Sequence, residues 1–158
     1  MADFLAVHNA VMGNEGALAN DKDDHGGLTY KGVAEKKHPG WPGFAIVKAI
    51  MLQFPDKKPA ELNPILQANQ ALQTMVLSFY KTEFWNVIKG DRINSFEEAR
   101  AIYDSAVNYG QTTAIKIVQN TLFSLPNQQK AKQAKINDLG ILYGFMDIKT
   151  LDKLNNNS

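Results

Sequence analysis

The sequence has no cysteine and no run of about 18 apolar residues. The first absence excludes a disulfide framework and thiol chemistry, and the second predicts that no transmembrane helix is present. The net charge is only +1, which excludes the strongly basic composition typical of nucleic-acid-binding proteins. The N-terminal residues 1–4 lack a basic region and an apolar stretch, so we expect no secretory signal.

What is present is ordinary for a globular protein. The chain has 158 residues, of which 44% are hydrophobic and 21% charged. This length is sufficient for one domain with a hydrophobic core, or for a domain plus a small subdomain. We find no internal repeat and no low-complexity segment beyond an Asn-rich tail.

Apolar residues recur mainly at helical spacing, and the turn signals between them are strong. A first helix is expected over residues 3–18, a short one over 44–54, and a long central one from Asn63-Pro64 to about residue 88. Ser95 opens a capping box for a helix that ends at Gly110, and a short final helix begins at about Ile148. The predicted fold is all-α: a helical bundle around a long central helix, with one small β-hairpin near residues 28–33.

Glu15 falls within the apolar stripe of the first predicted helix, four residues after Val11 and eight after Val7. Burial disfavours the charged form of a carboxyl group and raises its pKa, which suits a general acid. The alternative is that Glu15 lies at a frayed helix end and points to water. A turn-rich segment follows, with Asp21, Asp23 and Asp24 before the glycine pair at 26–27.

The order Glu-Gly, Asn-Asp, Asp-Asp-x-Gly-Gly-x-Thr-x-x-Gly-Val over residues 15–33 resembles the opening of the glycoside hydrolase family 108 type of N-acetylmuramidase. These lysozyme-like proteins occur among phage endolysins and among bacterial proteins first labelled secretion activators. The usual opening of the family is Glu-Gly-Gly-Tyr, whereas this chain has Ala17-Leu18 after Gly16. A second resemblance lies in residues 103–119, which are similar to the run Phe-Asp-x-Ala-Val-Asn-x-Gly and the helix that follows it in the family.

Residues 137–151 resemble, more weakly, the ending of a peptidoglycan-binding module. We therefore expect a lysozyme-like catalytic region over residues 1–90 and a helical peptidoglycan-binding-like region over residues 91–158, packed together as one compact unit.

The resemblance implies that Glu15 is the acid. Asp24 is our first choice for the ionised partner, with Asp21 and Asp23 as competitors, and Thr29 is expected to orient a water molecule. Enzymes that cleave glycosidic bonds normally use such a pair of carboxyl groups. Substrate contacts are expected from seven residues: Asn20, Asp21, Tyr30, Trp85, Asp104, Asn108 and Tyr109. Asp104 and Asn108 are four residues apart, so they can instead hydrogen-bond to each other.

A calcium-binding loop is the alternative interpretation of the acidic segment. Asp21, Asp23 and Gly26 match positions one, three and six of a calcium-binding EF-hand loop, but position five is His25 and position twelve is Gly32 instead of the required glutamate. The chain's histidines, at positions 8, 25 and 38, have no zinc-type spacing. We therefore expect no metal and no other cofactor.

Two classes of function remain open. The first is an enzyme that cuts the β-1,4 bond between N-acetylmuramic acid and N-acetylglucosamine in peptidoglycan glycan strands. The second is a catalytically silent cell-wall-binding or secretion-related protein that keeps the fold. In either case we expect a monomer of bacterial or phage origin, made in the cytoplasm and acting at the cell wall or periplasm.

Overall fold

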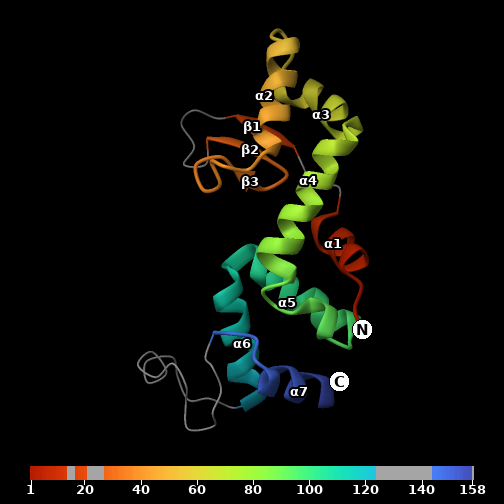
Figure 1. Ribbon diagram of the computed structural model, residues 1–158, viewed down its shortest axis with the longest axis vertical. Coiled ribbons are helices and arrows are strands. Elements are labelled where there is room, and N and C mark those ends of the chain that lie inside the picture. Colours follow the sequence, from red (N-terminus) through yellow and green to blue (C-terminus); the bar gives the residue numbers. More distant parts are fainter. Residues whose placement is uncertain (14–16, 21–26, 124–143, 158) are drawn as a thin grey trace. The chain divides into compact units, whose positions relative to one another are not determined.

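A computed structural model describes residues 1–13, 17–20, 27–123 and 144–157 (Figure 1). Helices dominate this part of the chain, and the strands in it form a small antiparallel sheet, so the prediction of an α-dominated lysozyme-like fold is confirmed. The chain divides into two compact units. The first unit comprises residues 1–13 and 81–158, and the second comprises residues 14–80.

The first unit is built on α1 (Phe4–Met12) and α5 (Phe96–Tyr109), which pack against each other. The ring of Phe4 lies 5.6 Å from Trp85 and 6.3 Å from Tyr103, centroid to centroid, and His8 Nδ1 lies 2.7 Å from the Tyr103 hydroxyl. Trp85 belongs to a π-helical turn over Lys81–Trp85, which directly follows α4 (Gln70–Tyr80), and a 3₁₀ turn covers Gly90–Arg92. The core of this unit is therefore aromatic at its N-terminal end.

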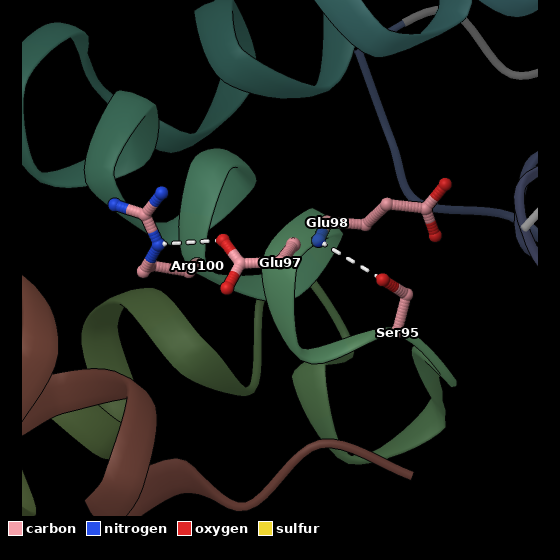
Figure 2. A network of polar contacts seen from close by, with 4 residues as sticks. All are labelled: Ser95, Glu97, Glu98 and Arg100. Carbon is pink, nitrogen blue, oxygen red and sulfur yellow. Dashed lines mark hydrogen bonds and ion pairs between the residues drawn. The ribbon is translucent and has the colours of Figure 1, made fainter.

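Helix α5 begins where the capping box predicted it. Ser95 Oγ accepts a hydrogen bond from the backbone N–H of Glu98 at 3.3 Å, and Arg100 Nε donates to the carboxylate of Glu97 at 3.1 Å (Figure 2). These local contacts satisfy one of the free N–H groups in the first turn, which is what fixes a helix start. The helix ends at Gly110, which has a positive φ of 89°.

Helix α6 (Gln111–Phe123) packs on α5, and α7 (Ile148–Asn156) packs on α6. The fully buried Gln119 joins them: its Nε2 donates to the carbonyl of Phe145 and to Thr150 Oγ1, and its Oε1 accepts from the N–H of Gly144. The predicted final helix from residue 148 is confirmed. Only part of the segment that resembles a peptidoglycan-binding module lies in the described residues, and that resemblance is not confirmed.

The second unit holds the sheet, in the order β1-β2-β3, and three helices. The strands are β1 (Leu18–Asn20), β2 (Leu28–Tyr30) and β3 (Val33–Ala34), and the helices are α2 (Gly43–Gln53), α3 (Pro59–Ala68) and α4 (Gln70–Tyr80). Leu18, Tyr30 and Val33 share the buried face of the sheet. The predicted extended segment is thus present: it contains β2 and the start of β3, and β1 adds a third strand beyond the single hairpin that was predicted.

Two helix predictions were wrong in extent. The first helix ends at Met12, not at residue 18, because Gly13 caps it with a positive φ of 53°. The single helix predicted over 63–88 is two helices separated at Asn69, whose side chain accepts from the N–H of Leu72 and starts α4. Asn63 is not a cap: it lies inside α3 and its Oδ1 accepts from the N–H of Leu18.

The two compact units do not follow the predicted division at residue 90. Helix α1 belongs with α5 because their aromatic side chains share one core, although 82 residues lie between Met12, the end of α1, and Ser95, the cap of α5. The assignment of a catalytic role to residues 1–90 and a binding role to residues 91–158 stays a prediction.

Candidate active site

The sheet of the second unit carries the candidate residues that lie around the acidic segment. In β1 and β2, Leu18 pairs with Tyr30, Ala19 with Thr29, and Asn20 with Leu28. Side chains alternate between the faces of a strand, and directly paired residues share a face. Thr29 therefore projects from the same face as Ala19 and Ala34, and Asn20 projects from the face that carries Leu28.

A tight turn of Lys31 and Gly32 joins β2 to β3. Both residues have positive φ angles, 45° and 77°, as a two-residue type I′ hairpin turn requires. Lys31 is a non-glycine residue in the left-handed region, which costs free energy unless the surroundings hold it there. At Gly32 any Cβ would collide with the hydroxyl of Tyr80, so glycine is required at this position for space as well as for conformation.

Two side chains of α4 hold this turn. Tyr80 donates from its hydroxyl to the Lys31 carbonyl at 2.8 Å. Gln73 accepts from the Lys31 ammonium at 2.9 Å through Oε1, and its Nε2 donates to the Tyr30 hydroxyl at 3.0 Å and to the Leu66 carbonyl at 2.8 Å. Strand β2, and with it Thr29, is thus fixed to α3 and α4 by polar contacts as well as by apolar packing.

The electrostatics of this network keep its phenol groups neutral. Burial raises the pKa of Tyr80 to about 12. Burial also raises the pKa of Tyr30 above its ordinary value, while the hydrogen bond from Gln73 partly lowers it. Both hydroxyls therefore keep their protons at physiological pH, and Tyr80 remains a hydrogen-bond donor to the turn.

The acidic candidates Glu15, Asp21, Asp23 and Asp24 lie outside the described residues. Their neighbours in the chain are described: Asn20 is exposed at the end of β1, and Thr29 is half-buried in β2. Since Asn20 and Leu28 are paired, the aspartates belong to the connection between two adjacent strands. Asn20 and Thr29 are brought onto neighbouring strands, but their side chains project from opposite faces of the sheet.

Tyr30 and Trp85 were predicted to contact substrate, and the structure places both in the core. Neither side chain is exposed. Tyr30 bonds to Gln73, and Trp85 Nε1 donates to the Asp91 carboxylate at 2.7 Å. Each ring packs in the core of its own unit, Tyr30 in the second and Trp85 in the first, and neither has exposed surface that a glycan could contact.

The remaining candidates lie on the last turns of α5, in the first unit. Asn108 Nδ2 donates to the carbonyl and to the carboxylate of Asp104, at 2.9 and 3.0 Å. The two exposed side chains are thus bonded to each other, as the sequence spacing allowed. Tyr109 follows them with 69% of its surface exposed.

The side chains that position β2, Gln73 and Tyr80, were not predicted as site residues. They lie seven residues apart on α4, and nothing in their local sequence distinguishes them from other polar or aromatic residues of an amphipathic helix.

Within the described ranges, no group of three or more His, Asp or Glu side chains is arranged to hold a metal ion. No helix in the same ranges is both long enough and apolar enough to cross a membrane.

Comparison with known proteins adds two findings. The solved structure described as "Structure of Brucella abortus SagA" is similar in fold, with a TM-score of 0.55 and 20% sequence identity, over 97% of this chain and 68% of that one. A comparison with curated protein sequences gave no significant match. Residues 8–110 match the family described as Glycosyl hydrolase 108. This match covers more than half of the chain and includes the acidic segment, the sheet and α5, and the protein therefore belongs to the glycosyl hydrolase 108 family.

Proposed function

We propose that the protein is an N-acetylmuramidase that cleaves the β-1,4 bond between N-acetylmuramic acid and N-acetylglucosamine. Family membership already points to a glycoside hydrolase with peptidoglycan as its substrate. The observation that carries the finer proposal is the match over residues 8–110, which contains the complete Glu-to-Val segment of residues 15–33. In this proposal Glu15 is the acid, Asp24 the ionised partner and Thr29 the residue that orients water.

The described strands support a catalytic role for the connection between β1 and β2. The aspartates belong to the connection between β1 and β2, and the base of that connection is fixed by strand pairing and by the contacts of Gln73 and Tyr80. Catalytic side chains must be held to within fractions of an ångström, and a short loop on an anchored sheet meets that need better than a free loop.

The alternative is a silent cell-wall-binding protein, and it was suggested by Ala17-Leu18 in place of Gly-Tyr. Leu18 is buried on the inner face of the sheet and pairs with Tyr30. The leucine therefore fills a core position. Packing thus explains the leucine of this departure, and a core position gives no reason to expect the loss of activity. Nothing in the structure explains the exposed Ala17.

The central test is Glu15→Gln, assayed by the clearing of purified peptidoglycan suspensions. Glutamine keeps the shape of the side chain but cannot donate the proton, so we expect activity to fall by about two orders of magnitude or more, with an unchanged circular dichroism spectrum. Glu61→Gln is the matched control, because Glu61 lies in the first turn of α3 and has no role in the proposal. Activity close to wild type in Glu15→Gln would remove Glu15 from the acid role.

The choice of partner is tested by comparing Asp24→Asn with Asp21→Asn and Asp23→Asn. We expect Asp24→Asn to reduce turnover most, because Asp24 is the proposed partner of Glu15. A chelator should leave the activity unchanged, since residues 21–32 lack the ligands of an EF-hand at positions five and twelve. Loss of activity in EDTA, with recovery in calcium, would instead identify a metal-dependent loop.

The proposal extends to the surface of α5. Asp104, Asn108 and Tyr109 are exposed there and are proposed to bind the glycan. For the second unit, glycan binding is proposed separately for Asn20 and Asp21. We propose that the protein acts as a monomer at the cell wall or periplasm, in lysis, remodelling or secretion.

A further inference from the structure

Lys31 adopts a backbone conformation that is costly for its residue type. It is the first central residue of the tight turn between β2 and β3 and has a φ of 45°, while Gly32 follows it with a φ of 77°. Turns of this kind favour Asn-Gly or Asp-Gly, because a long side chain in the left-handed region costs free energy. Strained residues of this sort cluster at functional sites, where the side chain has a task.

The side chain of Lys31 is held in one direction by Gln73 on α4. Gln73 Oε1 accepts a hydrogen bond from the Lys31 ammonium at 2.9 Å. The amide group cannot be reversed, because its Nε2 donates at 2.8 Å to the Leu66 carbonyl, which can only accept. The ammonium group is therefore positioned by the turn, α3 and α4 together.

This contact holds the positive charge of Lys31 without neutralising it, because glutamine is uncharged. In the part of the chain that the structure describes, the Lys31 ammonium forms no ion pair and bonds only to Gln73. The phenol groups on either side of Gln73 and the turn, those of Tyr30 and Tyr80, keep their protons at physiological pH. An ammonium group has three N–H donors, so two of them remain for an acceptor on a ligand.

Lys31 is also accessible and lies close to a residue of the proposed site. It is half-exposed at the end of the hairpin, whereas Lys48 on α2 is paired with the carboxylate of Glu35. Thr29, the proposed water-orienting residue, precedes Lys31 by two residues, which limits the distance between their Cα atoms to about 7 Å. A group bound to Lys31 therefore lies next to the strand that carries Thr29.

A lysine ammonium group without an acidic partner favours a carboxylate, with which it forms a charge-assisted hydrogen bond. The two sugars of the proposed substrate differ in this respect. N-acetylmuramic acid carries a lactyl group, whose carboxyl group is either free or linked to a peptide that has carboxylates of its own. N-acetylglucosamine has no carboxyl group.

We propose that Lys31 is a specificity-determining residue that binds a carboxylate on the N-acetylmuramic acid side of the substrate, with Gln73 holding its ammonium group in place. This inference rests on the proposed function for the identity of the substrate. It goes beyond that proposal because it assigns the distinction between the two sugars to a residue outside the acidic segment.

The test titrates three probes into the full chain and follows the NMR shifts of the backbone amides of residues 29–34. The probes are N-acetylglucosamine, N-acetylmuramic acid, and N-acetylmuramic acid linked to the dipeptide L-alanyl-D-isoglutamine. The first probe has no carboxylate, the second carries one on the lactyl group, and the third carries one on the peptide. The titrations therefore distinguish the two sources of the carboxylate.

We expect the amides of residues 31–32 to shift with at least one of the two acidic probes and not with the neutral one. Lys31→Asn should weaken this binding by about two- to fivefold, the range of an exposed ion pair, because asparagine suits the turn but has no charge. Lys31→Arg should bind like wild type. Lys37→Met is the matched control, because it removes an exposed positive charge from the same unit, and it should leave the affinity unchanged.

Gln73→Glu is the second variant, because it leaves Lys31 in place and neutralises its charge. It should weaken the binding of the acidic probes as Lys31→Asn does, with an unchanged circular dichroism spectrum. A role of Lys31 in the turn alone predicts no such loss, since the ammonium group keeps a partner. Unchanged binding in either variant, or equal shifts with all three probes in wild type, would overturn the proposal.

Failure of this inference and failure of the proposed function give different results. If wild type does not clear peptidoglycan but binds an acidic probe through Lys31, the proposed enzymatic activity fails and the carboxylate site stands. If wild type clears peptidoglycan and Lys31→Asn binds the probes as wild type does, the carboxylate site fails and the enzymatic activity stands.

Discussion

Tyr80 places its hydroxyl against the turn that joins β2 to β3. The hydroxyl donates to the Lys31 carbonyl and occupies the space that a side chain on Gly32 would need. Removal of one intramolecular hydrogen bond typically lowers stability by about 1 kcal/mol. Tyr80→Phe should therefore reduce the free energy of unfolding by about that amount at pH 7, measured by urea titration, whereas Tyr109→Phe at an exposed position should have no effect.

The same residue gives a pH prediction. Burial raises the pKa of Tyr80 to about 12, while a tyrosine in the unfolded chain titrates near 10. Between these values the unfolded state loses its proton first. The stabilisation is therefore complete below about pH 10 and is lost as the pH rises towards 12. We expect the decline in unfolding free energy over this window to be shallower in Tyr80→Phe than in wild type; parallel curves would contradict the assignment.

For single residues, the type of side chain can be read from the sequence, but the side chains that surround it in the fold cannot. Trp85 and Tyr30 are aromatic residues near conspicuous motifs, and an aromatic ring suits both a sugar-binding groove and a core. Burial depends on which elements meet in space, as Phe4 and Tyr103 meet around Trp85. The bond between Asp104 and Asn108 could be foreseen, because it depends only on the spacing along one helix.

Helix α4 presents Leu72, Val76 and Tyr80 to the core of the second unit on a single face. Leu72 has no exposed surface. Leu72→Ala should cost about 2–5 kcal/mol of unfolding free energy, because it removes buried methyl groups and leaves a cavity. Leu52→Ala on α2, where the leucine is 81% exposed, is the control and should change stability by less than about 0.5 kcal/mol. Equal effects would mean that α4 is not a core helix.

The elements that could be predicted are those whose ends are set locally. The start of α5 is fixed by the contact between Ser95 and Glu98, which are three residues apart and can be recognised directly in the sequence. The break at Asn69 was missed because the apolar pattern continues across it, from Leu66 to Leu72, although asparagine is a strong helix-capping residue. The end of α1 at Met12 could also have been predicted, because Gly13 directly follows it and glycine commonly ends helices.

At the scale of the whole molecule, described residues that follow the family match form part of a core. Helices α6 and α7 bury Ala114, Ile115, Leu151 and Leu154. Helix α6 packs on one face of α5, and α7 packs on α6. A chain truncated after Gly110 keeps the full family match but exposes that face. It should therefore lose cooperative thermal unfolding, measured by circular dichroism.

Truncation after Asn156 is the control, because it leaves intact the contacts of Asn155 with Asn94 and Arg92. We expect this variant to melt like wild type. If the chain ending at Gly110 also melted like wild type, residues 111–158 would be a separable module, as the predicted division of the chain supposed.

The order of the two units along the chain has a consequence for synthesis on the ribosome. The second unit is continuous, residues 14–80, whereas the first is made from both ends of the chain. Helix α1 is translated before the second unit but packs on α5, which is translated after the whole second unit. The nascent chain thus carries the apolar side of α1, with Phe4 and Val7, uncovered for the entire time that the sheet and its helices are being made. A helix synthesised before the second unit can therefore reach its partner α5 only after that unit has been made.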